Sequence, residues 1–163
     1  MKRKYRILVI VFCILLALDQ ATKLFIEHSF SLHQSTVVIP GFFAITHVQN
    51  RGAAFGLLAS LPGAATIFVI ISLIAIGLII TYFRQTKEGE VWTPLCLSLV
   101  LTGAAGNLID RFRLGVVVDF LDFHYRGWHW PAFNVADASI TIGVILLALN
   151  ILWGEKKETT EEI

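Results

Sequence analysis

Residues 7–26 of the chain read ILVIVFCILLALDQATKLFI, a run that is apolar except near its end. Because a helix rises about 1.5 Å per residue, about 20 apolar residues are needed to cross a hydrocarbon core about 30 Å thick. Three further runs of this kind occupy approximately residues 64–83, 92–108 and 135–153. We therefore predict an all-α integral membrane protein with four transmembrane helices, forming a single membrane domain over residues 1–163.

The composition of the 163-residue chain agrees with a membrane location. Hydrophobic residues make up 56% of the chain and charged residues 15%, whereas soluble domains are about 45–50% apolar and about 25% charged. This composition excludes disordered, coiled-coil and basic nucleic-acid-binding chains, which need far more charge. The formal net charge of +1 indicates no charged class of partner. Cys13 and Cys96 both lie inside apolar runs, so we predict no disulfide.

The distribution of Lys and Arg predicts the orientation of the helices. Eight of these residues lie in residues 1–6, 84–91 and 154–163, and four lie in residues 27–63 and 109–134. Cytoplasmic segments are enriched in Lys and Arg. We therefore expect both termini, the connection 84–91 and the tail 154–163 to be cytoplasmic. The outer connections 27–63 and 109–134 are then extracytoplasmic.

The first apolar run also fits a cleaved secretory signal, because it follows a basic start. Against that alternative, the apolar register resumes after Asp19 and continues to Ile26, and Lys23 is an unusual neighbour for a cleavage site. Cys13 lies in the middle of the run, unlike the modified cysteine of a lipoprotein precursor. We therefore favour a retained helix.

The two outer connections differ in composition. The first contains β-prone runs at 36–39 and 42–48 separated by Pro40 and Gly41, which predicts a small β-hairpin. The second is an aromatic outer loop, and aromatic residues commonly lie at the headgroup level of a membrane. Its aromatic residues include Phe120, Phe123, Tyr125, Trp128, Trp130 and Phe133.

Several polar residues lie within the predicted membrane helices or directly after them, where transfer of a polar side chain into lipid is unfavourable in free energy. Asp19 and Lys23 are four residues apart on one helical face, so they can form an ion pair that points into the bundle. Asn107, Asp110 and Arg111 project from one face after the small residues at 103–106. For Asp19 and Lys23 a packing ion pair competes at least equally with a chemical role. For Asp110 and Arg111 we favour a structural role over a catalytic one.

Asp119 and Asp137 are the candidates for chemistry. Asp119 lies in an apolar, extended segment, and Asp137 follows Asn134 at the expected start of the fourth helix. Asp137 alone would be interpreted as part of a helix cap. Both carboxylates, however, flank the same aromatic connection on the same side of the membrane. Two adjacent carboxylates retain one proton between them and can act as general acid and general base on one water.

Other hydrolytic chemistries lack the residues that they need. The five histidines show no HExxH pattern and no Cys/His spacing typical of a metal site. No serine lies in a GxSxG frame, and no glycine-rich phosphate loop is present. We therefore expect no metal and no other cofactor, and we interpret the histidines as ordinary interfacial residues.

Five sequence blocks, in family order, resemble the lipoprotein signal peptidases, also called signal peptidase II. The resemblance extends over nearly the whole chain, and each block alone would be weak. The blocks are DQATK at 19–23, NRGAAFG at 50–56, GNLIDR at 106–111, VDF at 118–120 and FNVAD at 133–137.

The resemblance implies an aspartic endopeptidase of the bacterial cytoplasmic membrane. Such an enzyme removes the signal peptide from prolipoproteins after the cysteine has received its diacylglyceryl group. Asp119 and Asp137 match the catalytic pair, while Asp19 and Lys23 match structural or lipid-proximal positions. The positions that match residues supporting or lining the site are Asn50, Arg51, Gly52, Asn107, Asp110, Arg111, Asn134 and Ala136.

The implied partners are lipid-modified prolipoproteins and membrane lipid, with no nucleic acid and no indication of an oligomer. The alternative is a non-enzymatic small membrane protein, such as a transporter subunit or a lipid-binding scaffold. That alternative accounts for Asp19 and Lys23, but not for two further acids on one outer face. The sequence also shows no inverted repeat of the kind found in many transporters.

Overall fold

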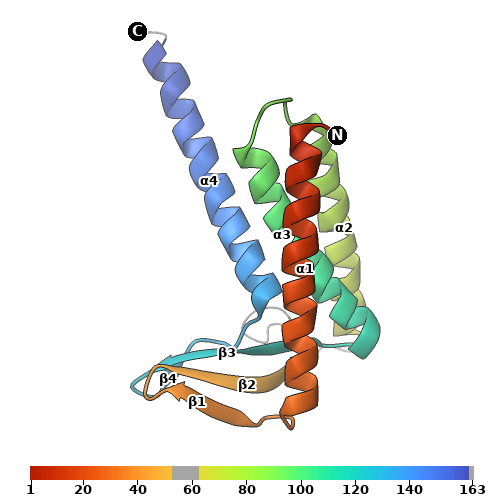
Figure 1. Cartoon of the computed structure of the whole chain (residues 1–163), viewed down its shortest axis with the longest axis vertical. Coiled ribbons are helices and arrows are strands. Elements are labelled where there is room, and N and C mark those ends of the chain that lie inside the picture. The colour runs from red at the N-terminus through yellow and green to blue at the C-terminus, as the bar shows by residue number, and fades with distance from the viewer. Residues whose placement is uncertain (53–62, 162–163) are drawn as a thin grey trace.

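The computed structural model describes residues 1–52 and 63–161. Within these residues, four helices are long and apolar enough to cross a membrane, as predicted. Figure 1 shows the helices packed along one another, with a small sheet at one end. The start of α1 and the end of α4 lie at the opposite end. In chain order the elements are α1 (Arg3–Ser29), β1 (Ser35–Ile39), β2 (Phe43–Asn50), α2 (Ala64–Gln85), α3 (Trp92–Leu114), β3 (Val117–Tyr125), β4 (Trp128–His129) and α4 (Val135–Glu161).

Helix α3 is the centre of the bundle, because it packs against α1, α2 and α4. In its most apolar 18-residue stretch 61% of the residues are buried, against 11–17% in the other three helices. Small residues allow this close packing. A Cβ atom at Gly106 would lie 2.5 Å from Asp19 Oδ2 and 3.3 Å from the Cβ of Ala136. Gly106 therefore lets α3 approach both α1 and α4.

The sheet has four antiparallel strands in the order β1-β2-β3-β4. The predicted hairpin is confirmed as β1 and β2, which are joined at Pro40 and Gly41, the latter with a φ of 73°. The aromatic outer connection is more than a loop, because residues 117–125 and 128–129 of it form β3 and β4, and residues 109–114 belong to the end of α3. Its β-branched and aromatic residues favour extended backbone, and β2 offers them a strand to pair with.

All four helices extend beyond the apolar runs that predicted them, most of all at the C-terminal ends of α3 and α4. Helix α3 continues from the expected end near residue 108 to Leu114, where Gly115 adopts a φ of 72° and its N–H donates to the carbonyl of Arg111 at 3.0 Å. This is the usual left-handed end of a helix. Helix α4 continues to Glu161, so Gly154 does not end it and the expected tail is largely helical. Lys and Glu, which are good helix formers, dominate that segment.

A buried ion cluster joins three helices at the sheet end of the bundle. The side chain of Lys23 is fully buried, and its Nζ lies 2.9 Å from Asp19 Oδ2 and 2.8 Å from Asp110 Oδ2. Lys23 also donates to Asn107 Oδ1 at 3.0 Å. Asp19 Oδ1 accepts the N–H of Ala136 at 2.9 Å. The cluster therefore connects α1 and α3 to the first turn of α4.

Replacing Gly106 with alanine tests this packing. We expect Gly106→Ala to lower the free energy of unfolding by about 1–3 kcal/mol, the usual cost of an oversized group in a packed interior. The added methyl would displace the Asp19 carboxylate from Lys23. The measurement is thermal unfolding of the purified protein in detergent.

The matched control is Gly77→Ala in α2, where a Cβ atom would meet nothing within 4 Å. Because alanine has the higher helix propensity, stability there should be unchanged or raised. Equal effects of the two substitutions would contradict the proposed close approach at Gly106.

Candidate active site

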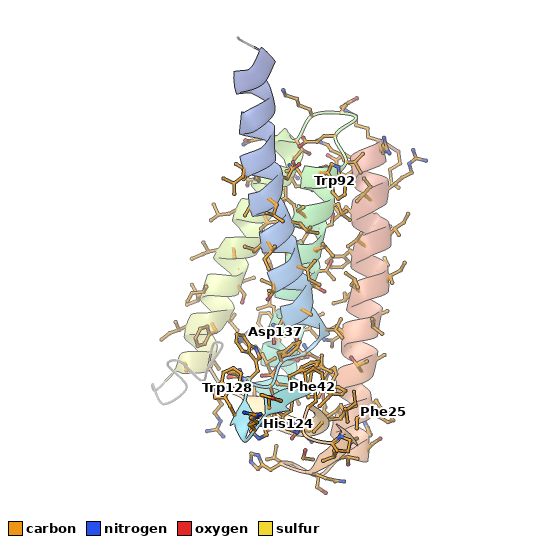
Figure 2. The ribbon with its side chains drawn as sticks, turned by 90° about the vertical axis from the view of Figure 1, so that its left-hand side faces the viewer. Phe25, Phe42, Trp92, His124, Trp128 and Asp137 are labelled. Carbon is orange, nitrogen blue, oxygen red and sulfur yellow. The ribbon has the colours of Figure 1, made fainter. Side chains whose placement is uncertain are left out.

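The sheet and the start of α4 together place the two candidate aspartates. Asp119 lies on β3 between Val118 and Phe120, which pack into a buried cluster with Ile26 of α1. Asp137 is the third residue of α4. The N–H of Asp137 donates to Asn134 Oδ1 at 2.8 Å, so Asn134 caps the helix. Figure 2 shows Asp137 at the sheet end of α4.

Two asparagine side chains connect the two carboxylates. Asn107 Nδ2 donates to Asp137 Oδ1, and Asn134 Nδ2 donates to Asp119 Oδ1, each at 2.7 Å. Asn134 Nδ2 also lies 3.2 Å from Asn107 Oδ1, which completes the connection. From β2, Asn50 Nδ2 donates to the other oxygen of Asp119 at 3.1 Å. Neutral amide donors therefore surround the two acids.

The electrostatics of Asp119 fit a proton-transfer role. Asp119 is 2% exposed, and burial raises its pKa to about 7, with the negative charge of Asp137 as the next cause. The hydrogen bonds from Asn50 and Asn134 and the charge of Lys23 oppose this shift in pKa. A carboxyl group with a pKa near 7 can hold or release a proton at neutral pH.

Both carboxylates line one cleft of about 660 Å³. Asn50, Gly52, Asn107 and Arg111 line the same cleft near the aspartates. Away from them the cleft continues between α2, α3 and α4, where its walls are almost entirely apolar. The apolar residues of this part are Phe68, Ile71, Ala75, Ile79, Val100, Ala104, Ile140 and Ile142.

Other predicted site residues lie behind the cleft rather than in its wall. Lys23 pairs with Asp19 and Asp110, and Asp110 Oδ2 accepts the N–H of Val118 at 3.3 Å. Ala136 is buried, and its backbone N–H is held by Asp19. Lys23 therefore holds the carboxylate of Asp110, and Asp110 in turn anchors β3 by accepting the N–H of Val118.

Arg111 anchors the chain that follows β2. Its guanidinium donates to the carbonyl of Gly52 at 3.2 Å and lies 5.3 Å above the ring of Phe68. The N–H of Gly52 donates in turn to Asn50 Oδ1 at 2.9 Å. Arg51 is exposed between them. The remaining residues of the predicted block, 53–56, lie outside the described part of the chain.

Two walls of the cleft are formed by residues that the sequence does not mark as part of a site. One is α2, whose residues carry no polar signal that sets them apart from lipid-facing ones. The other is the segment 130–133 after β4, where the aromatic side chains of Trp130 and Phe133 predict only a position at the headgroup level. The sequence does place Trp130 and Phe133 between Asp119 and Asp137, and this position could have indicated that they lie near the two carboxylates.

Known proteins resemble this chain over almost its full length. The family model described as "Signal peptidase (SPase) II" matches residues 11–153. The lipoprotein signal peptidase of Geobacter metallireducens is 44% identical over 161 residues, covering 99% of each chain. That of Geobacter sulfurreducens is 46% identical over 158 residues, covering 97% of this chain and 99% of the relative.

A solved structure described as a bacterial membrane enzyme superposes with a TM-score of 0.83. It is 36% identical, and the match covers 96% of this chain and 91% of that one. A second structure with the same description gives a TM-score of 0.80 at 37% identity, covering 89% and 92%. Fold, sequence and family model agree. The chain belongs to the signal peptidase II family of lipoprotein signal peptidases, which are aspartic peptidases.

Proposed function

We propose that this protein cleaves the signal peptide from diacylglyceryl-modified prolipoproteins, just before the lipidated cysteine, with Asp119 and Asp137 activating the attacking water. The observation that carries the proposal is the pair of carboxylates in one cleft, linked through Asn107 and Asn134. The family is enzymatic, so the alternative of a non-enzymatic scaffold is no longer needed to account for the buried charges.

In the proposed reaction the pair holds one proton. One aspartate takes a proton from water while the water oxygen attacks the scissile carbonyl carbon. The other, protonated aspartate donates its proton to the carbonyl oxygen. As the C–N bond breaks, the leaving amine takes a proton from one aspartate, and a hydroxyl of the tetrahedral intermediate returns its proton to the other, so that the pair again holds one proton. The pKa of Asp119 near 7 supports this sharing of one proton at neutral pH.

The apolar part of the cleft is the proposed binding site for the hydrophobic segment of the signal peptide. It begins beside Asp137 and is bounded by α2 and α4 on either side of α3. The acyl chains of the substrate would remain in lipid. Because a signal peptide is itself an apolar segment, burial against these helices supplies binding without further charges.

The remaining residues have supporting roles in this proposal. Asn50, Asn107 and Asn134 orient the two carboxylates, and Arg111 fixes the backbone at Gly52. For Arg51, which is exposed, we propose a contact with substrate outside the cleft. The buried ion cluster of Asp19, Lys23 and Asp110 does not line the cleft. It holds the backbone N–H groups of Val118 and Ala136, next to the two aspartates.

We also propose that the sheet and the cleft face the extracytoplasmic side, with both termini in the cytoplasm. The excess of Lys and Arg at the end opposite the sheet supports this orientation.

Asp119→Asn and Asp137→Asn should each lower kcat by about 100-fold to 10,000-fold, because an amide cannot act as base or acid. Cleavage of a diacylglyceryl-modified precursor, beside its unlipidated twin, is the measurement, and only the lipidated form should be cut by the wild-type protein. Asp122→Asn, on the same strand but outside the cleft, is the matched control and should retain activity. Near wild-type turnover in Asp119→Asn or Asp137→Asn would exclude the proposed pair.

Activity should follow a bell-shaped pH profile. At acid pH both carboxyl groups are protonated and no base remains; as pH rises above about 7, Asp119 loses the proton that the acid step needs. Asn50→Ala removes a hydrogen bond that lowers the pKa of Asp119. The alkaline limb of kcat/KM should therefore move up, by about one pH unit if the bond contributes about 1.4 kcal/mol. A limb that stays in place or moves down would contradict the assignment of that limb to Asp119.

Cysteine labelling tests the orientation. After Cys13 and Cys96 are replaced, Lys87→Cys and Arg126→Cys each place one exposed thiol at opposite ends of the bundle. In intact cells an impermeant thiol reagent should label the variant at 126 and not the variant at 87. Both should react after the cells are opened. The reverse pattern in intact cells would place the cleft on the cytoplasmic side.

A further inference from the structure

The β3–β4 hairpin brings together three potential metal ligands outside the cleft. Asp122 and His124 are two residues apart on β3, so they lie on one face of the strand. His129 on β4 pairs directly with His124. One ligand atom from each of the three residues lies within 4.8 Å of the other two. Figure 2 shows His124 at the sheet end of the molecule.

The contacts inside this cluster are close. His129 Nδ1 lies 2.9 Å and 3.1 Å from the two carboxylate oxygens of Asp122. The rings of His124 and His129 stack with centroids 4.8 Å apart. His124 Nδ1 is buried and has no hydrogen-bond partner within the described residues. His124 thus has a nitrogen that the described protein groups do not use, beside a carboxylate and a second imidazole.

We propose that Asp122, His124 and His129 bind one divalent transition-metal ion of the zinc type, which ties β3 to β4. Two imidazoles and one carboxylate suit zinc, whereas magnesium and calcium prefer oxygen ligands alone. Three protein ligands leave the fourth tetrahedral position to water. The side chain of His129 is 56% exposed, so an ion can reach the site from solvent.

The observed spacing needs only small side-chain movements to hold such an ion. Bonds of about 2.0–2.1 Å in a tetrahedral site place the ligand atoms about 3.3 Å apart. The Asp122–His129 contact at 2.9 Å must open slightly, and the ligand atoms that lie up to 4.8 Å apart must close. Rotation about side-chain bonds supplies both movements while the backbone pairing of β3 and β4 is kept.

The position of the cluster connects it to the wall of the cleft. β4 leads directly into residues 130–133, which line the cleft, and the N–H of Trp130 donates to the carbonyl of Phe123 at 2.8 Å. An ion held between β3 and β4 fixes the start of this wall without contacting Asp119 or Asp137. The site is therefore a structural one, and the basal reaction does not need it.

Zinc binding to the full chain is the direct test. The protein is purified in detergent without a histidine tag, stripped with EDTA, and titrated with Zn²⁺ or Mg²⁺ by calorimetry. We expect one Zn²⁺ per chain and no Mg²⁺ at this site. His129→Ala and Asp122→Asn should each weaken zinc binding by about tenfold or more. His28→Ala, which removes an exposed histidine at the end of α1, is the matched control and should leave binding unchanged.

Hydrogen exchange of the wild-type protein supplies a measurement that does not depend on any variant. Zn²⁺ should slow amide exchange in residues 121–133 and leave α2 unaffected. In EDTA, Asp122→Asn and His129→Ala should still cleave the lipidated precursor at the wild-type rate. Absence of stoichiometric zinc binding, equal binding by His129→Ala and wild-type, or unchanged exchange in residues 121–133 would each overturn the proposal.

Discussion

The buried ammonium of Lys23 is the constraint on which the arrangement of this site depends. A charge with no exposed surface must be paired and hydrogen-bonded, and Asp19, Asp110 and Asn107 meet that need. The two carboxylates of the cluster also accept backbone N–H groups, Asp110 that of Val118 and Asp19 that of Ala136. Each of those N–H groups belongs to the residue directly before Asp119 or Asp137. One buried lysine therefore fixes the backbone beside both acids of the proposed pair.

Much of the fold follows from local sequence signals. Apolar length alone predicts four helices, and Pro40 with Gly41 between β-prone runs predicts the first hairpin. The placing of Asp119 and Asp137 at one end of the bundle also follows, because both flank the same outer connection. Each of these predictions rests on residues that are close in sequence, because apolar length, turn formation and the side of the membrane are determined by a single segment of the chain.

The features that the sequence did not predict depend on contacts between residues that are distant in the chain. Strand β3 pairs with β2 in one register, and residues 117–123 alone specify neither this partner nor this register. Lys23 had a local partner in Asp19, and Asp110 had Arg111 beside it, so nothing in the sequence pointed to the Lys23–Asp110 pair. His124 and His129 are likewise joined by strand register rather than by a linear metal-binding spacing. Sequence patterns find elements, whereas these contacts exist only once the elements have packed.

Within the described residues, the hydrogen-bond donors to the two carboxylates are neutral amides rather than charged side chains, and this affects whether the pair keeps a proton. Burial and the negative charge of Asp137 push Asp119 toward the neutral form, and the hydrogen bonds from Asn50 and Asn134 oppose that shift in pKa without adding charge. A lysine or arginine in their place would hold the pair ionised and would remove the proton that the acid step requires. Lys23 instead contacts Asn107, which in turn contacts Asp137, so an amide separates the cation from the reacting carboxylate. The cation can therefore stabilise the packing of α1, α3 and α4, while the pKa of Asp119 stays near 7 and one proton remains available at neutral pH.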